Sequence, residues 1–242
     1  MAYFSRVELD RRAPAKALLP LLNPSDPGAR LDAHHRLIWT LFPSPSGQKR
    51  DFLWRTDGDG RFYILSHRQP ELNDLFRPFM PKTFEPDLKA GDKLAFLLRA
   101  NATKTRPHDK LGADKRHRRV DVVMHALKSV PGLPQNPPAD CHSKRAEQRF
   151  AIARHEGEKW LKAQGSRHGF TVEDFMLEDY STIPLPRPGR PQGRREQEPK
   201  FGILDMRGIL AVTDPAAFIA KLLQGFGRAK GFGCGLMMIR RV

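Results

Sequence analysis

Two adjacent histidines, His34 and His35, are the first candidates for chemistry in this sequence. Histidine titrates near neutral pH, so it can act as a general acid or a general base. On a helical wheel His34 falls inside the apolar stripe of residues 31–42, whereas His35 lies at its border beside Trp39. A border position can face a cleft, which favours His35 for proton transfer. The alternative is that both histidines are partly buried and structural.

The same histidines are poorly arranged for binding a metal ion. Adjacent side chains on a helix diverge by about a third of a turn, so His34 and His35 cannot share one ion. The two cysteines, Cys141 and Cys234, are far apart, and there is no His-Glu-x-x-His motif. We therefore expect no metal site and no disulfide, as in a protein of the reducing cytoplasm.

Two basic stretches have the composition of phosphate-binding segments. Residues 99–119 carry eight Lys and Arg against two Asp, enough to neutralise phosphates over one face of a duplex. Residues 187–195, expected on a hairpin, supply arginine forks that suit phosphate and guanine. The alternatives are a solvated charged loop and a disordered linker, respectively. The predicted nucleic-acid contacts in or beside these stretches are Lys104, Lys115, Arg116, Arg119, Arg194 and Arg195.

A glycine-rich stretch near the end of the sequence holds five glycines within the eleven residues 225–235. Asp214-Pro215 opens a helical pattern before it, and a short apolar strand follows, so the order is helix, glycine loop, strand. A dinucleotide-binding loop needs the opposite order. Lys230 also lacks the Ser or Thr that follows the lysine of a Walker A loop. A tight turn is therefore the first alternative to a binding role.

The elements expected around these residues form two similar groups. Residues 3–9 predict a strand, 51–66 a hairpin with a turn at Asp57-Gly58-Asp59-Gly60, 32–42 the histidine helix and 93–100 a central strand. This is close to a β-α-β-β-α-β unit. The second half predicts strands at 120–123, 169–177, 201–212 and 236–239, with helices at 143–163 and 215–224. The sequence therefore predicts an α+β fold of two tandem ferredoxin-like domains, residues 1–100 and 101–242, with a cleft between them.

The composition bounds the class of partner. The 242 residues suffice for one large or two small domains, and the formal net charge is +15 with a pI of about 10.3. Such an excess favours a polyanionic partner, and nucleic acid before membrane, because there is no long apolar run and no basic amphipathic helix. The alternative is a protein that simply uses arginine freely. The N-terminal residues alternate like a strand and do not resemble a signal peptide.

Three segments together resemble the CasE family, the type I-E branch of the CRISPR-associated RNA-processing endoribonucleases. Residues 225–227 and 233–236 resemble the family's C-terminal glycine-rich motif, residues 35–43 its histidine helix, and residues 98–104 its Arg-Ala-Asn-Pro-x-Lys segment. The segments follow the family's order along the chain. Two positions depart from the pattern: Asp32 stands where a tyrosine is common, and Ala102 replaces the proline.

The resemblance implies metal-independent cleavage of CRISPR repeat RNA beside its hairpin, with the enzyme then staying on the guide RNA as a subunit of the Cascade complex. The catalytic histidine of the family corresponds to His35. Asp32 leaves open what orients that histidine, and the alternative is that it only caps the helix. We expect no cofactor and no membrane association. In this setting the glycine stretch is predicted to face RNA opposite the histidine helix, with Phe226 and Phe232 as core anchors, and its predicted RNA contacts are Gly225, Gly227, Lys230, Gly233 and Gly235.

RNA chemistry then defines the expected mechanism. The 2′-OH of the substrate attacks the adjacent phosphate, giving a 2′,3′-cyclic phosphate and a 5′-OH. His35 would act as general acid or base, and backbone N–H groups with Lys or Arg would stabilise the phosphoryl charge. Two alternatives stay open: a non-catalytic RNA-hairpin-binding protein on the same fold, and a ribosome-associated or tRNA-binding protein suggested by charge alone.

Overall fold

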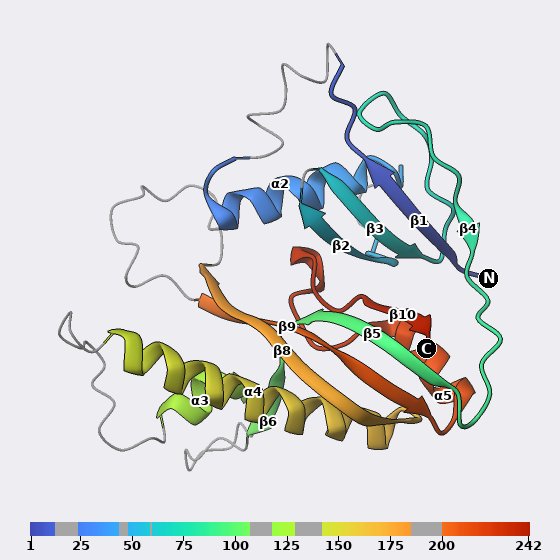
Figure 1. Cartoon of the computed structure of the whole chain (residues 1–242). Helices are drawn as coiled ribbons and strands as arrows, with labels where there is room; N and C mark the ends of the chain where they lie inside the picture. Colours follow the sequence, from blue (N-terminus) through green and yellow to red (C-terminus); the bar gives the residue numbers. More distant parts are fainter. Residues whose placement is uncertain (13–23, 44–47, 59, 107–117, 129–141, 185–199) are drawn as a thin grey trace, which may run out of the picture.

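The computed structural model contains two four-stranded antiparallel sheets with helices packed on them (Figure 1). The first sheet lies over the glycine loop, which follows the helix at Pro215–Gln224. The structure describes residues 1–12, 24–43, 48–58, 60–106, 118–128, 142–184 and 200–242.

The first sheet has the strand order β2-β3-β1-β4, which is the ferredoxin-like order. Its strands are β1 (Tyr3–Glu8), β2 (Phe52–Gly58), β3 (Arg61–Ser66) and β4 (Lys82–Thr83). The predicted hairpin between β2 and β3 is confirmed, and Gly58 and Gly60 both adopt positive φ in its turn. One face packs against the histidine helix through Val7, Trp54 and Ile64.

The histidine helix, α2 (Pro27–Trp39), begins earlier than the sequence pattern predicted. Asp26 is its N-cap and accepts a hydrogen bond from Ala29 N at 2.8 Å, with Pro27 at the first helical position. The apolar periodicity starts only at Leu31, because the first turn of α2 is not a core face. Asp32 is therefore an interior residue of the helix, and the capping role considered for it is wrong.

The second sheet has the order β10-β5-β9-β8, which is again ferredoxin-like. Helices α4 and α5 cover one face of it, and β6 and β7 form a hairpin after β5. The strands are β5 (Lys93–Ala100), β6 (Thr103–Arg106), β7 (Arg118–Asp121), β8 (Phe170–Pro184), β9 (Lys200–Val212) and β10 (Met237–Arg241). The helices are α3 (Val122–Lys128), α4 (His142–Arg167), α5 (Pro215–Gln224) and the 3₁₀ turn η3 (Lys230–Phe232).

The two tandem ferredoxin-like units of the prediction are confirmed, but the strand that closes the first one is not β5. The fourth strand of the first sheet is the two-residue β4, and β5 lies between β10 and β9 in the second sheet. Leu94, Phe96 and Leu98 of β5 belong to the core under α4 and α5. The apolar pattern of a strand does not specify which strands it pairs with. The prediction therefore followed sequence order and assigned β5 to the wrong sheet. Whether residue 100 separates two folding units stays a prediction.

Smaller differences concern where elements end. The predicted strand at 120–123 is split, because α3 begins at Val122. Asp121 accepts hydrogen bonds from Val123 N and Met124 N, each at 3.0 Å, and so starts that helix. Strand β8 continues beyond residue 177 to Pro184. Helix α5 has the predicted bounds, with Asp214 as its N-cap and Gly225 as its C-cap.

The two units meet through a small apolar cluster. Leu53 and Leu65, on the face of the first sheet opposite α2, pack with Leu236 at the start of the last strand region. Beside this cluster, Arg55 of β2 reaches Asp205 of β9, with 3.6 Å between the nitrogen and the oxygen. The glycine loop therefore lies where the two sheets join.

Candidate active site

His35 projects from α2 with its ring partly buried against aromatic side chains. Trp39, one turn later, donates its indole N–H to Nε2 of His35 at 3.1 Å. This bond makes Nε2 an acceptor, so the neutral ring carries its proton on Nδ1. Burial, and then the charge of Arg50, lower the pKa of His35 below its ordinary value, with Arg36 adding to this and Asp32 opposing it. The ring is thus held neutral and oriented.

His34 is a different kind of residue. It is 5% exposed, and its ring meets the edges of Phe62 at 5.0 Å and Trp54 at 6.2 Å between centroids. Burial lowers its pKa to about 4, and its Nδ1 has no hydrogen-bond partner. The structural alternative considered for both histidines therefore describes His34.

Asp32 is engaged on its own helix. It accepts hydrogen bonds from the guanidinium of Arg36, four residues later, on the exposed side of α2. Its carboxylate is therefore occupied by a cation.

The glycine loop lies against His35, as predicted. A Cβ built on Gly231 would lie 3.5 Å from Cε1 and 3.7 Å from Nε2 of His35, and 3.5 Å from Nη1 of Arg50. The backbone at Gly231 is not in the positive-φ region. This glycine therefore marks a point where the histidine, the arginine and the loop converge with no loop side chain between them.

The other glycines of the loop have packing reasons of their own. At Gly227 and Gly235 an added Cβ would meet backbone, 2.4 Å from the carbonyl oxygen of Asn101 and 2.8 Å from that of Phe226, respectively. At Gly225 and Gly233 it would meet side chains, 2.7 Å from Leu53 and 3.1 Å from Trp54, respectively. All four have positive φ, and all except Gly227 are buried. Their contact with RNA stays a prediction. Phe226, which is fully buried, is the core anchor that the sequence predicted, and Phe232 packs partly buried against Phe201.

The segment Arg99-Ala100-Asn101 holds the loop in place. Gly235 N donates to the carbonyl of Arg99 at 2.7 Å, and Arg228 N donates to the carbonyl of Asn101 at 3.0 Å. The Asn101 side chain in turn donates to the carbonyl of Gly202 at 2.7 Å. The segment therefore fixes the backbone of the glycine loop through hydrogen bonds to its carbonyl groups.

Two cations stand at the same place, and only one of them was predicted. Lys230 donates from Nζ to the carbonyl oxygen of Gln224 at 2.6 Å, and burial followed by the charge of Arg50 lowers its pKa. Arg50, which precedes β2, is half-buried, and its Nε has no hydrogen-bond partner. Arg50 was missed because it follows Lys49 in a short irregular stretch that matches no motif, and only tertiary structure brings it to His35.

The predicted contacts of the basic stretches lie elsewhere. Lys104 and Arg119 are on the β6–β7 hairpin, where Lys104 Nζ is 4.0 Å from Glu156 of α4, and Figure 1 shows β6 beside α4 and away from α2. They are not brought together with His35. Four others, Lys115, Arg116, Arg194 and Arg195, fall outside the described residues.

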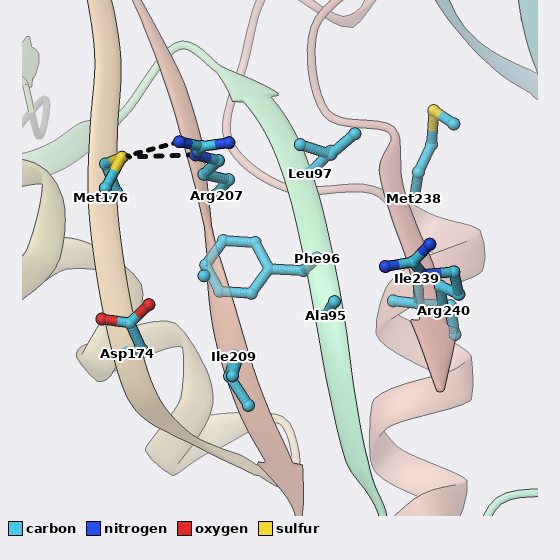
Figure 2. A pocket seen from close by; sticks show the side chains of 11 residues that line it. Ala95, Phe96, Leu97, Asp174, Met176, Arg207, Ile209, Met238, Ile239 and Arg240 are labelled. Atoms are coloured by element: carbon cyan, nitrogen blue, oxygen red, sulfur yellow. Dashed lines mark hydrogen bonds between the residues drawn. The ribbon is translucent and has the colours of Figure 1, made fainter. Parts of the chain in front are cut away.

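The open face of the second sheet carries a hollow of about 610 Å³ (Figure 2). Leu97, Met176 and Met238 line it together with Arg207, whose guanidinium contacts Met176 Sδ at 3.2 Å and Glu178 at 3.2 Å. Asp174 is the one carboxylate among the side chains that line the hollow, and none of the lining residues was a predicted site residue. The hollow is separate from the site at His35.

Within the described ranges, no cluster of three or more His, Cys, Asp and Glu side chains is arranged to hold a metal ion. Cys234 is buried, and burial raises the pKa of its thiol to about 12. None of the helices in those ranges is long and apolar enough to span a membrane.

Comparison with known proteins places the chain in a family. A family model described as CRISPR associated protein matches residues 2–241, so the chain belongs to the CRISPR-associated proteins. Within them its relatives are of the CasE type, which confirms the resemblance seen in the sequence.

Two curated relatives and two solved structures illustrate the similarity. The CRISPR system Cascade subunit CasE of Escherichia coli is 29% identical over 217 residues, covering 85% of this chain and 89% of the relative. The CRISPR-associated endoribonuclease Cse3 of Thermus thermophilus is 27% identical over 208 residues, covering 86% and 81%. The structure of Cse3 bound to a 19-nucleotide RNA has a TM-score of 0.63 at 20% identity, and that of Escherichia coli Cas6e 0.57 at 24%. Each covers 99% of this chain and 100% of the other.

Proposed function

We propose that this protein is an endoribonuclease that cleaves CRISPR precursor RNA beside repeat hairpins and remains bound to the guide RNA within a Cascade complex. The observation that carries the proposal is the convergence of His35, Arg50 and the glycine loop at Gly231. Family membership, RNA-bound and Cascade-associated relatives, and the charge of +15 support it.

The proposed reaction needs no metal-bound water. The 2′-OH next to the scissile bond attacks the phosphorus and loses its proton, while the 5′-oxygen leaves and gains one. The products are a 2′,3′-cyclic phosphate and a 5′-OH. Before the reaction the ring of His35 is neutral, and its basic nitrogen is Nε2, which accepts from Trp39. Taking the proton of the 2′-OH at Nε2 would break that bond, and the protonated ring would then be the acid for the leaving oxygen. Trp39 holds the tautomer and is a positioning residue.

The test is cleavage of a labelled repeat-hairpin RNA in EDTA. Wild type should cut once beside the hairpin and leave ends that resist ligation until the cyclic phosphate is removed. His35→Ala should lose about 10²–10⁴-fold in the cleavage rate, the usual contribution of general acid–base catalysis, while hairpin affinity is retained.

His34→Leu is the matched control, since it changes the neighbouring histidine without touching the loop. It should keep the cleavage activity. A requirement for added Mg²⁺, or activity that survives His35→Ala but not His34→Leu, would contradict the assignment. Hairpin binding without any cleavage by wild type would instead favour a non-catalytic RNA-binding protein.

A further inference from the structure

Beside His35 lie two cations, Arg50 and Lys230, that no carboxylate of the described residues balances. Burial lowers the pKa of both Arg50 and Lys230. The charge of Arg50 further lowers the pKa of Lys230 and of His35, so the three groups lie close together. Among the described residues, no carboxylate forms an ion pair with either cation. Asp51, next in the chain to Arg50, is already bound by Arg68 at 2.6 Å.

A partly buried guanidinium whose Nε has no partner is unfavourable unless an anion accepts its hydrogen bond and balances its charge. Arg149 also has a buried Nε without a partner, but its guanidinium donates to Thr182 and lies over the Tyr180 ring. Two other half-buried arginines show the contrast with Arg50. Arg68 has Asp51, and Arg99 has Asp205 at 2.8 Å. Arg50 alone among these three points its charge towards a histidine and a glycine.

Gly231 leaves a space between these groups. A Cβ on Gly231 would lie at van der Waals distance from Arg50 Nη1 and from the His35 ring, so the bare Cα lets a phosphate oxygen approach Arg50 from the side that a methyl group would otherwise cover. Lys230, the preceding residue, is held by the carbonyl of Gln224 and lies in the same turn.

We propose that Arg50 is a catalytic residue that binds a non-bridging oxygen of the scissile phosphate, in a pocket that Gly231 keeps open beside His35. This inference rests on the proposed function. Arg50 would stabilise the charge that accumulates on the phosphoryl oxygens as the 2′-oxygen attacks, and Lys230 adds to the same field. No proton passes to or from the guanidinium, because its pKa is far above neutrality.

The cleavage test uses substitutions at Arg50 with matched controls. Arg50→Gln should reduce kcat about 10²–10³-fold, as for removal of one oxyanion donor, with KM little changed, and Arg50→Lys should recover part of the loss. Arg6→Gln removes the same charge from β1, where Arg6 pairs with Glu8, and should cleave normally. Wild-type rates from Arg50→Gln, with His35→Ala inactive, would overturn this proposal and leave the proposed function standing.

The space at Gly231 is tested by filling it. Because its φ is not positive and an added Cβ makes only ordinary contacts, Gly231→Ala should fold normally, bind the hairpin and cleave at least tenfold more slowly. Gly157→Ala in α4 is the control, since its Cβ would also make ordinary contacts, 3.4 Å from Leu204, but far from His35. Equal cleavage by both alanine variants would exclude a pocket at Gly231.

A binding measurement separates the pocket from the reaction. The His35 Cε1–H resonance is followed against pH with and without inorganic phosphate. Charged groups facing His35 are Asp32 and Arg36 on its own helix and Arg50 from the neighbouring segment. Phosphate should raise the pKa of His35 in wild type but not in Arg50→Gln, and Arg50→Gln alone should raise it without phosphate. Equal phosphate responses would refute the pocket, whether or not wild type cleaves RNA.

Discussion

At the scale of single residues, two adjacent histidines have opposite roles because of one helical step. His34 points into the core between Trp54 and Phe62, and His35 points to the glycine loop. The helical wheel predicted this division from sequence alone. It could not predict Arg50, because the sequence does not reveal which of the chain's many cations the fold brings to a histidine.

His34 makes stability sensitive to mild acid. Its pKa is about 4 in the folded protein and near 6.5 when unfolded, so the unfolded state binds the proton first as the pH falls. The free energy of unfolding is therefore unaffected by protonation of His34 above pH 6.5 and falls as the pH drops towards 4. The total loss over this range is about 3 kcal/mol. His35, with its lowered pKa, acts in the same direction.

Urea unfolding of wild type and His34→Leu between pH 7.5 and 4.5 measures the effect. The variant should be at least as stable at pH 7.5, because it removes an unpartnered ring nitrogen from an apolar site, and its stability should fall less with acid. Carboxylates such as Glu8, whose bonds to Arg6 and Arg61 lower its pKa to about 2, act only at lower pH. Parallel pH profiles for the two proteins would be inconsistent with a buried neutral His34.

At the scale of elements, the glycine loop both packs between the two sheets and lies against His35. Its helix–loop–strand order, the caps of α5 and the buried Phe226 all follow from sequence rules for caps and apolar periodicity. Which glycine faces His35 did not follow. Five glycines look alike in a sequence, and only the contacts of the folded chain separate Gly231 from the four that pack internally.

Gly227→Ala should therefore behave unlike Gly231→Ala. At Gly227 the φ is +67° and a Cβ would lie 2.4 Å from the carbonyl oxygen of Asn101, so the loop must move away from β5. We expect a loss of about 1–3 kcal/mol in the free energy of unfolding from the strained backbone alone. Denaturant unfolding of both variants is the measurement, and equal stability of the two would contradict this division of the loop.

At the scale of the whole molecule, the two sheets are joined by charge as well as by Leu53, Leu65 and Leu236. Asp205 of β9 accepts three bonds from Arg99, at 2.9, 3.2 and 2.8 Å, and faces Arg55 of the first sheet at 3.6 Å. The strand types of both units were predictable from alternation and turns. The placement of β5 was not, because pairing such as Arg99 with Asp205 links residues that are far apart in the chain.

Asp205→Asn should weaken this joint. It leaves two largely buried guanidinium groups without their counter-charge, which typically costs about 3–5 kcal/mol. Calorimetry should show a lower melting temperature, whereas Asp174→Asn on the open sheet face serves as a control with little effect. An unchanged melting temperature for Asp205→Asn would show that the apolar contacts suffice to hold the sheets together.

The contact of Gly231 with His35 also determines when during synthesis the site can form. His35 is synthesised before Gly231, and α5, from which the glycine loop emerges, lies between them in the sequence. A chain shortened before the loop therefore carries the histidine without the residues that surround it. Under the proposed function, such a chain should not cleave RNA, so no separate inhibitor is needed while the protein is being made.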